Sequence, residues 1–405
     1  MKSSRLPVLL VGGGMISQDV ILPTLFQERR RGHVGEIYVA SRRSDTIIAL
    51  RERFPGEEFK GYPDPDKFGP GRSDPEAYMK ALSELPEEGA VVVATPDHLH
   101  TPVIMDAIAA GHHMIVEKPL CLKVSEAHSI MDASREKGIY VLTDYHKRHD
   151  RAIRAAKFKY GRGELGEMLH GHAWIEEKRE MPLKVFERWC EKSSPFEYIG
   201  IHYADAYFFI TGLKPRRLVA FGQKKFLPKH GKDAFDAIQA TIEWSDGSVL
   251  FIQTSWVCSE FNTALTNQGL QLSGTEGEYW ADHKNRNLYF LTQKHGFEHY
   301  NPNFFKPYDS FDWEGGIEYV GYGYDSIAQG LDDISRINEA VRGMSSEDAA
   351  LKRREIVSKL EAVRALPSQA LVGTAIIEGA RLSISNGSRF VYFDSQLYPR
   401  IEGTS

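Results

Sequence analysis

The sequence predicts an α/β fold in which an N-terminal parallel-sheet domain precedes an α+β domain with a large, mostly antiparallel open sheet. Strand-like and helix-like segments alternate over residues 1–145, which is typical of parallel sheets. Beyond residue 146, strand-like segments follow one another without helices between them, which favours an antiparallel or mixed sheet. At 405 residues the chain is also long for a single core. We therefore expect two domains, residues 1–145 and residues 146–405.

Bulk composition is that of a globular protein, and it excludes several classes of function. Hydrophobic residues make up 42% and charged residues 26% of the chain. The net charge of −5 and the absence of a basic block argue against a nucleic-acid partner. No apolar run is long enough to cross a membrane, and the apolar start has no small-residue cleavage site. The three cysteines are far apart and odd in number, which indicates a reducing compartment and predicts a cytoplasmic protein.

The N-terminus has the pattern of a dinucleotide-binding turn. An apolar strand at residues 6–11 runs directly into Gly-Gly-Gly-Met-Ile-Ser, after which helical spacing resumes. Glycines allow the backbone to approach a diphosphate, and the N-terminus of the helix offers free N–H groups. Ser17 replaces the third glycine of the usual pattern, a position that serves helix packing and tolerates a small side chain. We expect the cofactor to contact Gly12, Gly14, Met15 and Ile16.

The end of the second predicted strand, residues 36–40, bears on the choice of cofactor. An NAD site usually has an acidic residue here that binds the ribose hydroxyls. This chain instead has Ser41, Arg42 and Arg43, which suit a 2′-phosphate because guanidinium groups bind phosphate in a bidentate manner. NADP(H) is therefore favoured over NAD(H). A solvated basic turn is the alternative, and Asp45 could still reach the ribose.

Residues 91–120 predict a strand, a short helix and a second strand that ends in Glu117, Lys118 and Pro119. Parallel strands place functional groups just beyond their carboxyl ends, so Lys118 is a candidate functional residue. The whole stretch, ATPDHLHTPVIMDAIAAGHHMIVEKPL, resembles the signature of the glucose–fructose oxidoreductase/inositol dehydrogenase/rhizopine catabolism (Gfo/Idh/MocA) family of nicotinamide-dependent oxidoreductases. The resemblance implies a Rossmann domain in which Lys118 lies beside the nicotinamide and touches the substrate hydroxyl.

The same resemblance implies further cofactor and substrate contacts. Residues 144–149 are similar to the family segment that passes the nicotinamide and enters the second domain. It places His146 near the ring and Arg148 at the substrate. The remaining cofactor contacts that it implies are Thr95, Pro96, His98, His100, Glu117 and Lys118 itself.

Residues 189–212 resemble the family segment that carries a catalytic histidine on a helix. His202 and Asp205 match that pattern, whereas Tyr198 stands where the family has its first acid. On a regular helix, positions four apart share a face, so Tyr198 and His202 are expected to line one surface and Glu197 to point elsewhere. We expect His202 to be the general base, Lys118 to polarise the oxygen, and Tyr198 to bind substrate, relay a proton or shape the pocket. Trp189 would offer an apolar ring face to a sugar.

The C-terminal half predicts an open sheet that needs cover on both faces. Strands are expected at residues 168–180, 218–226, 237–244, 249–257, 270–273, 277–281 and 288–292. Helices at residues 204–210 and 327–341 would cover one face, and subunit pairing the other, which predicts a homodimer or homotetramer. Residues 345–364 resemble a solvated charged helix. Residues 370–393 are similar to the family's last helix and strand.

These patterns together predict an NAD(P)-dependent oxidoreductase of CH–OH groups. Hydride would pass between the nicotinamide and a secondary alcohol or ketone of a sugar, glycoside, cyclitol or sugar acid. Two alternatives remain open: redox-neutral, NAD-assisted glycoside elimination, and a cofactor-binding regulator that has lost catalysis, which Tyr198 favours. A metal enzyme is disfavoured because the histidines at 98, 100, 112 and 113 lack a carboxylate at ligand spacing, so no metal is predicted.

Overall fold

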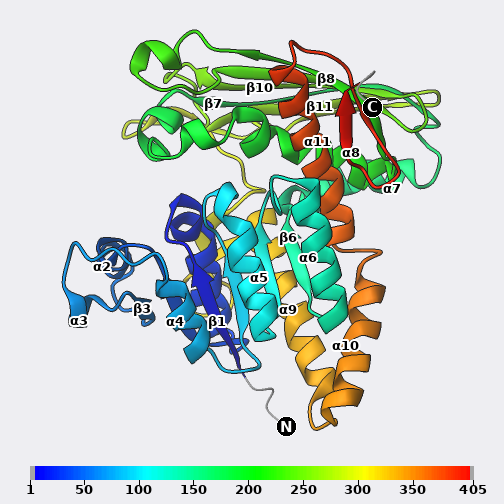
Figure 1. The fold of residues 1–405 in the computed structure, drawn as a ribbon. Helices are drawn as coiled ribbons and strands as arrows, with labels where there is room; N and C mark the ends of the chain where they lie inside the picture. The colour runs from blue at the N-terminus through cyan, green and yellow to red at the C-terminus, as the bar shows by residue number, and fades with distance from the viewer. Residues whose placement is uncertain (1–4, 402–405) are drawn as a thin grey trace. The chain divides into compact units, whose positions relative to one another are not determined.

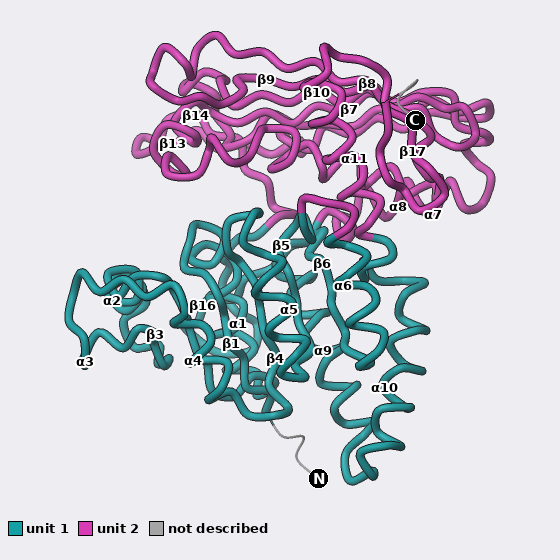
Figure 2. Tube along the Cα trace, viewed as in Figure 1, with its two compact units in different colours: residues 1–121, 126–146, 305–369 teal, residues 122–125, 147–304, 370–405 magenta. Residues whose placement is uncertain are grey.

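The computed structural model describes residues 5–401, which form two compact units (Figure 2). The first comprises residues up to 121, 126–146 and 305–369; the second comprises residues 122–125, 147–304 and those from 370 onward. The domain boundary expected between residues 145 and 146 lies one residue from the point where the chain passes from the first unit to the second, between residues 146 and 147. The sequence analysis did not foresee that the chain returns to the first unit at residues 305–369.

The first unit contains a six-stranded parallel sheet in the order β3-β2-β1-β4-β5-β6, so its parallel α/β architecture is confirmed. Short runs of β-branched and aliphatic residues, buried on both sides, make up its central strands. The strands are β1 (Leu6–Val11), β2 (Val34–Ala40), β3 (Lys60–Tyr62), β4 (Ala90–Val93), β5 (Met114–Glu117) and β6 (Val141–Asp144). The connecting helices are α1 (Leu22–Arg30), α2 (Ser44–Arg53), α3 (Pro65–Phe68), α4 (Ala77–Glu84), α5 (His100–Ala110) and α6 (Val124–Lys137).

Helix α9 (Tyr322–Val341) packs on the parallel sheet, so the prediction that residues 327–341 cover the C-terminal sheet is wrong. It contacts β5, β6 and α1, on the face opposite α5 and α6 (Figure 1). A Cβ at Gly330 would lie 2.6 Å from Ile115 Cδ1 and 3.0 Å from Leu142 Cδ2, so a side chain here would require these neighbours to shift. Amphipathic spacing indicates which helix face is buried but not which sheet covers it.

The return segment contributes a hairpin and one more helix to the first unit. The hairpin consists of β15 (Lys306–Asp309) and β16 (Ile317–Val320). Helix α10 (Ser346–Leu360) is the predicted charged helix; most of its side chains are at least partly exposed, and it packs on α9. Its N-terminus is capped by Ser345, whose hydroxyl accepts the N–H of Asp348 at 3.2 Å.

The second unit is built on an eight-stranded sheet in the order β12-β11-β7-β10-β9-β8-β17-β18. Only β7 and β10 pair in parallel, which confirms the mostly antiparallel sheet. The strands are β7 (Met168–Lys178), β8 (Pro215–Gln223), β9 (Ala237–Trp244), β10 (Val249–Cys258), β11 (Thr266–Gly274), β12 (Glu278–Asp282), β17 (Val391–Phe393) and β18 (Pro399–Ile401). The prediction that residues 288–292 continue this pattern is wrong, because β13 (Tyr289–Thr292) pairs with β14 (Gly296–His299) in a separate sheet.

Helices lie against one face of the large sheet. They are α7 (Arg151–Tyr160), α8 (Ile201–Thr211) and α11 (Pro367–Ser385). Along β9 and β10 buried residues alternate with half-exposed ones, as expected for a sheet with one covered face. In residues 5–401 we find no helix that is both long and apolar enough to cross a membrane.

Candidate functional site

The triple-glycine turn joins β1 to the helical segment that leads into α1. Gly12 has a φ of 121°, and a Cβ there would lie 2.2 Å from the carbonyl oxygen of Ala94. Gly14 is exposed, and no described atom lies within 4 Å of the Cβ position built on it. Met15 and Ile16, both half-exposed, begin the helical segment. An open backbone at a helix N-terminus fits the diphosphate of a dinucleotide.

The basic turn after β2 leaves two guanidinium groups at the surface. Arg42 and Arg43 are exposed and Ser41 is half-buried. Asp45 takes part in a loop contact, because its carboxylate accepts the backbone N–H of Gly71 at 2.8 Å and lies 3.6 Å from Arg43 Nε. The turn therefore presents more positive than negative charge where the ribose of a dinucleotide would lie.

The loop that follows β4 is held against the end of β5 by His100. This buried ring has Nδ1 2.7 Å from the carbonyl oxygen of Pro119 and Nε2 2.9 Å from that of Thr95. Among the described residues, Thr95 Oγ1 is buried without a hydrogen-bond partner. Pro96 and His98 are half-buried on the same loop. His100 therefore contacts backbone on both sides and positions the loop.

Lys118 directly follows β5 and is 8% exposed. Its neighbour Glu117 lies across from Asp144, the last residue of β6, in the strand register. The ring of His146 is buried and stacks on Tyr322 of α9 at 5.5 Å between centroids. The structure thus brings Lys118, Glu117 and His146 together at the carboxyl ends of neighbouring strands, where ligands bind in such sheets.

In the second unit, His202 lies buried in the first turn of α8. The prediction of a regular helix through Tyr198 and His202 is wrong, since residues Phe196–Gly200 form a π-helical turn. Gly200 leaves room for this turn, because a Cβ would lie 2.8 Å from Thr254 Cγ2 and would require a neighbour to shift. Such turns are rare and often occur at functional sites.

Tyr198 belongs to an aromatic cluster of the second unit. Its ring lies 5.3 Å from Trp189, 5.2 Å from Phe186 and 6.2 Å from Trp256. Trp189 and Tyr198 are both half-buried, so parts of their rings remain accessible. Glu197, next to Tyr198, is buried and pairs with Arg381 of α11 at 2.5 Å. Tyr198 therefore stands in an apolar ring cluster.

Arg148 has a buried carboxylate partner that the sequence did not reveal. Its guanidinium donates to both oxygens of Asp205, at 2.9 Å and 2.6 Å. Burial raises the pKa of Asp205, and the neighbouring Arg148 opposes that rise. The pair joins the start of the second unit to α8. Whether Arg148 also contacts a substrate stays a prediction.

A buried polar network around Lys147 was also not predicted. Lys147 Nζ donates to Gln268 Oε1 at 2.5 Å and lies 5.0 Å from the centroid of the Tyr203 ring. Tyr203 Oη is 2.8 Å from Nδ1 of His283. Burial lowers the pKa of Lys147 to about 7. A basic residue after a strand resembles a solvated turn in sequence, so only its packing identifies it as buried.

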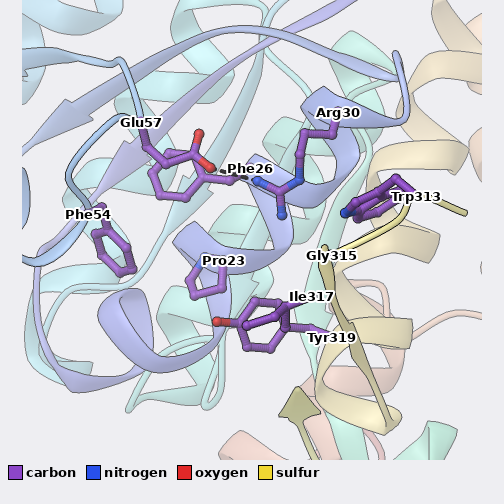
Figure 3. Close-up of a pocket in the computed structure, with 9 residues that line it drawn as sticks. All are labelled: Pro23, Phe26, Arg30, Phe54, Glu57, Trp313, Gly315, Ile317 and Tyr319. Atoms are coloured by element: carbon purple, nitrogen blue, oxygen red, sulfur yellow. Dashed lines mark hydrogen bonds and ion pairs between the residues drawn. The ribbon is translucent and has the colours of Figure 1, made fainter. Parts of the chain in front are cut away.

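A cavity of about 340 Å³ lies elsewhere in the first unit and contains none of the predicted site residues. Figure 3 shows the rings around it and the 2.6 Å pair between Arg30 and Glu57. Its lining is Pro23, Phe26, Arg30, Phe54, Glu57, Trp313, Gly315, Ile317 and Tyr319. A search of residues 5–401 for three or more grouped His, Cys, Asp or Glu side chains that could hold a metal ion found none.

Comparisons with known proteins agree with this geometry. Residues 6–145 match the family model described as oxidoreductase family, NAD-binding Rossmann fold, and residues 153–280 match the GFO/IDH/MocA C-terminal domain. The chain is 26% identical over 204 residues to 1,5-anhydro-D-fructose reductase of Ensifer adhaerens, covering 47% of this chain and 56% of that protein. It is 23% identical over 290 residues to levoglucosan dehydrogenase of Pseudarthrobacter phenanthrenivorans, covering 64% and 74% respectively.

A solved structure shows the same fold. The inositol dehydrogenase homologue of Azotobacter vinelandii, complexed with NADH and myo-inositol, superposes with a TM-score of 0.68 at 18% identity. The match covers 96% of this chain and 98% of that one. Together with the two family models, these matches show that the chain belongs to the Gfo/Idh/MocA family of NAD-binding oxidoreductases.

Proposed function

We propose that this protein transfers hydride between a nicotinamide cofactor and a secondary alcohol or ketone of a sugar, glycoside, cyclitol or sugar acid. The observation that carries the proposal is Lys118, buried directly beyond β5 in the unit that also holds the open glycine turn. Two relatives have names that describe reduction or dehydrogenation of carbohydrates, which supports this class of substrate.

The proposed roles follow from the chemistry of an alcohol. When bound, the cofactor would accept the hydride that leaves the carbinol carbon. His202 takes the hydroxyl proton as general base, because imidazole titrates near neutral pH. Lys118 donates a hydrogen bond to the same oxygen and stabilises its developing negative charge. Tyr198 and Trp189 contribute ring faces to the C–H side of a sugar, and the Tyr198 hydroxyl binds one of its oxygens.

The cofactor is proposed to be NADP(H). The exposed Arg42 and Arg43 support this choice because they can bind a 2′-phosphate. Asp45, which could have bound an unmodified ribose, is hydrogen-bonded to the Gly71 backbone. Replacing Arg42 and Arg43 with serine should weaken NADP(H) binding about tenfold or more and leave NAD(H) binding within about threefold. Equal losses for both cofactors would contradict the choice.

A homodimer or homotetramer is proposed through the uncovered face of the large sheet. Alternate residues of β9 and β10 are half-exposed on that face. Phe251 there lies 5.4 Å from the His172 ring, and the rings of His172 and Trp174 are 5.3 Å apart. Light scattering of the protein with Phe251→Lys would test the pairing, because a buried charge at a shared face should give monomers. An unchanged mass would contradict it.

The activity is tested by a screen followed by variants. Thermal shift and turnover would be measured with NAD and NADP against sugars, cyclitols and sugar acids. With the best substrate, Lys118→Ala and His202→Ala should each lower kcat by about a hundredfold or more. Exposed Lys123→Ala and His230→Ala are matched controls that should stay near the wild-type rate.

Three outcomes would contradict the proposal. Losses of only a few-fold in both variants would remove Lys118 and His202 from the chemistry. Glycoside cleavage without net change in nicotinamide absorbance would favour redox-neutral elimination. Cofactor binding without turnover of any alcohol in the screen would favour a regulator.

A further inference from the structure

Two buried carboxyl groups lie directly behind the residue that we assign to the substrate oxygen. Glu117 ends β5 and Asp144 ends β6, and the two residues are partners in the parallel register. Glu117 is 7% and Asp144 is 3% exposed, and their side chains are hydrogen-bonded to each other. Ionised carboxylates only accept hydrogen bonds, so a bond between two of them requires a proton on one.

We propose that Glu117 and Asp144 hold one proton between them at neutral pH, and that the resulting single negative charge keeps Lys118 positioned as an ammonium donor. The pair is thus a positioning device that acts through Lys118. The positioning role rests on the function proposed for Lys118, whereas the shared proton does not.

Unsatisfied oxygens in the pair support the shared proton. Among the described residues, Glu117 Oε1 and Asp144 Oδ1 are buried without a hydrogen-bond partner from any donor group. A buried acceptor without a donor is costly, and a proton held between the two carboxyl groups removes that cost. The hydroxyl of Ser326 on α9 donates to the carbonyl oxygen of Gly323 at 3.3 Å, and Ser326 lowers the pKa of the nearby Asp144.

The fold explains why these groups meet. Ser326 precedes Gly330 by one helical turn, so both lie on the face of α9 that packs on β5 and β6. The absence of a side chain at Gly330 leaves room for a close approach of the helix to β5 and β6, and Ser326 lies near enough to lower the pKa of Asp144. On the same face of α9, the Tyr322 ring stacks on His146, and the carboxylate of Asp333 accepts a hydrogen bond from the Tyr140 hydroxyl at 2.8 Å.

The surroundings of the two carboxyl groups indicate which of them carries the proton. Burial and the neighbouring Asp144 raise the pKa of Glu117 well above its ordinary value, and Lys118 opposes the rise. Burial raises the pKa of Asp144 to about 6, while Ser326, Glu117 and Lys118 lower it. The proton therefore resides mainly on Glu117, and a second proton neutralises the pair below about pH 6.

The charge of the pair should matter to Lys118 because a nearby negative charge attracts its ammonium group and holds the side chain in position. Besides the two carboxyl groups themselves, the side chains that shift their pKa values are those of Lys118, after β5, and Ser326, on α9. When the pair takes its second proton, Lys118 loses its negative neighbour. Activity should therefore decline as the pH falls through about 6.

The shared proton is tested first without any substrate. Infrared spectra of the cofactor-free protein at neutral pH should show a protonated-carboxyl band that shifts in D₂O. The band should be missing from the double variant Glu117→Gln with Asp144→Asn. Near-UV circular dichroism would confirm that this variant is folded, and Ser326→Ala, which keeps both carboxyl groups, serves as the second variant. No difference in this band between wild type and the double variant would overturn the inference.

The positioning role is tested by the pH profile of kcat/KM. Every protein with the general base His202 should lose activity in acid, and the wild type should show an additional loss near pH 6 that comes from the pair. Ser326→Ala should move this additional loss to higher pH, because Ser326 lowers the pKa of Asp144 and its removal lets that pKa rise further. The double amide variant should keep only the loss of activity that comes from the general base His202, and it should be about tenfold or more slower at neutral pH. Identical pH profiles in all three proteins would mean that the pair has only a structural role, and would overturn its proposed action on Lys118.

The two levels of failure can be told apart. If the carboxyl band is present and Lys118→Ala leaves turnover unchanged, the proposed function fails while the shared proton stands. If Lys118→Ala abolishes turnover and the band is absent, the function stands and the shared proton fails.

Discussion

The ion pair between Arg148 and Asp205 provides a quantitative test of how the second unit is held together. Its side chains are 7% and 3% exposed, and two hydrogen bonds of 2.9 Å and 2.6 Å join them. Asp205→Asn leaves a guanidinium buried without a charged partner. Breaking a buried pair in this way costs about 3–5 kcal/mol of the free energy of unfolding. The exposed pair of Lys159 and Glu164 is the matched control, and its loss should cost less than about 1 kcal/mol.

The two single variants should respond differently to pH. In Arg148→Met the buried carboxyl of Asp205 loses the neighbour that opposes the rise of its pKa, so that pKa rises further. An acid with a higher pKa in the folded state binds more protons folded than unfolded, so stability increases as the pH falls toward the unfolded pKa. Arg148→Met should therefore be more stable at mildly acidic pH than at neutral pH. Asp205→Asn should not, because the remaining guanidinium stays charged.

Urea unfolding at both pH values, followed by fluorescence, would measure these free energies. At about 2–4 °C per kcal/mol, the losses correspond to a fall in melting temperature of roughly 6–20 °C. The double variant Arg148→Met with Asp205→Leu should lose less than either single variant, because no charge remains buried. Additive losses in the double variant, or equal pH dependence in the two singles, would refute the reasoning.

Two glycine substitutions and one tyrosine substitution test the packing of the first unit. Gly12→Ala should destabilise the protein by more than about 1 kcal/mol and weaken cofactor binding, because it combines a positive φ with a Cβ 2.2 Å from the Ala94 oxygen; thermal shifts with and without NADP would measure both effects. Gly330→Ala should cost about 1–3 kcal/mol of the free energy of unfolding through its contact with Ile115. Exposed Gly343→Ala is the control without such a contact, and Gly343→Asn serves as the reference for the backbone strain at its φ of 77°. Tyr140→Phe should cost about 1–3 kcal/mol in urea unfolding, because Asp333 loses a buried donor; no loss would contradict the docking of α9 through this bond.

The local features of this protein could be predicted from its sequence because short segments determine them. The strand and glycine turn at residues 6–17 and the strand that delivers Lys118 depend on neighbouring residues only. The strand-like patterns at residues 237–244 and 249–257 likewise predicted β9 and β10, along which buried and half-exposed residues alternate. The family resemblance then supplied the roles expected of Lys118 and His202.

Tertiary structure alone decided which distant side chains meet. Arg148 and Asp205 are separated by 57 positions, and Ser326, which lowers the pKa of Asp144, lies on a helix that returns from the far half of the chain. Hydrophobic spacing shows that one face of α9 is buried, but the sheet that covers it depends on the space left by Gly330. The protonation of Glu117 and Asp144 follows from burial and contact, and neither quantity is a property of the residues in isolation.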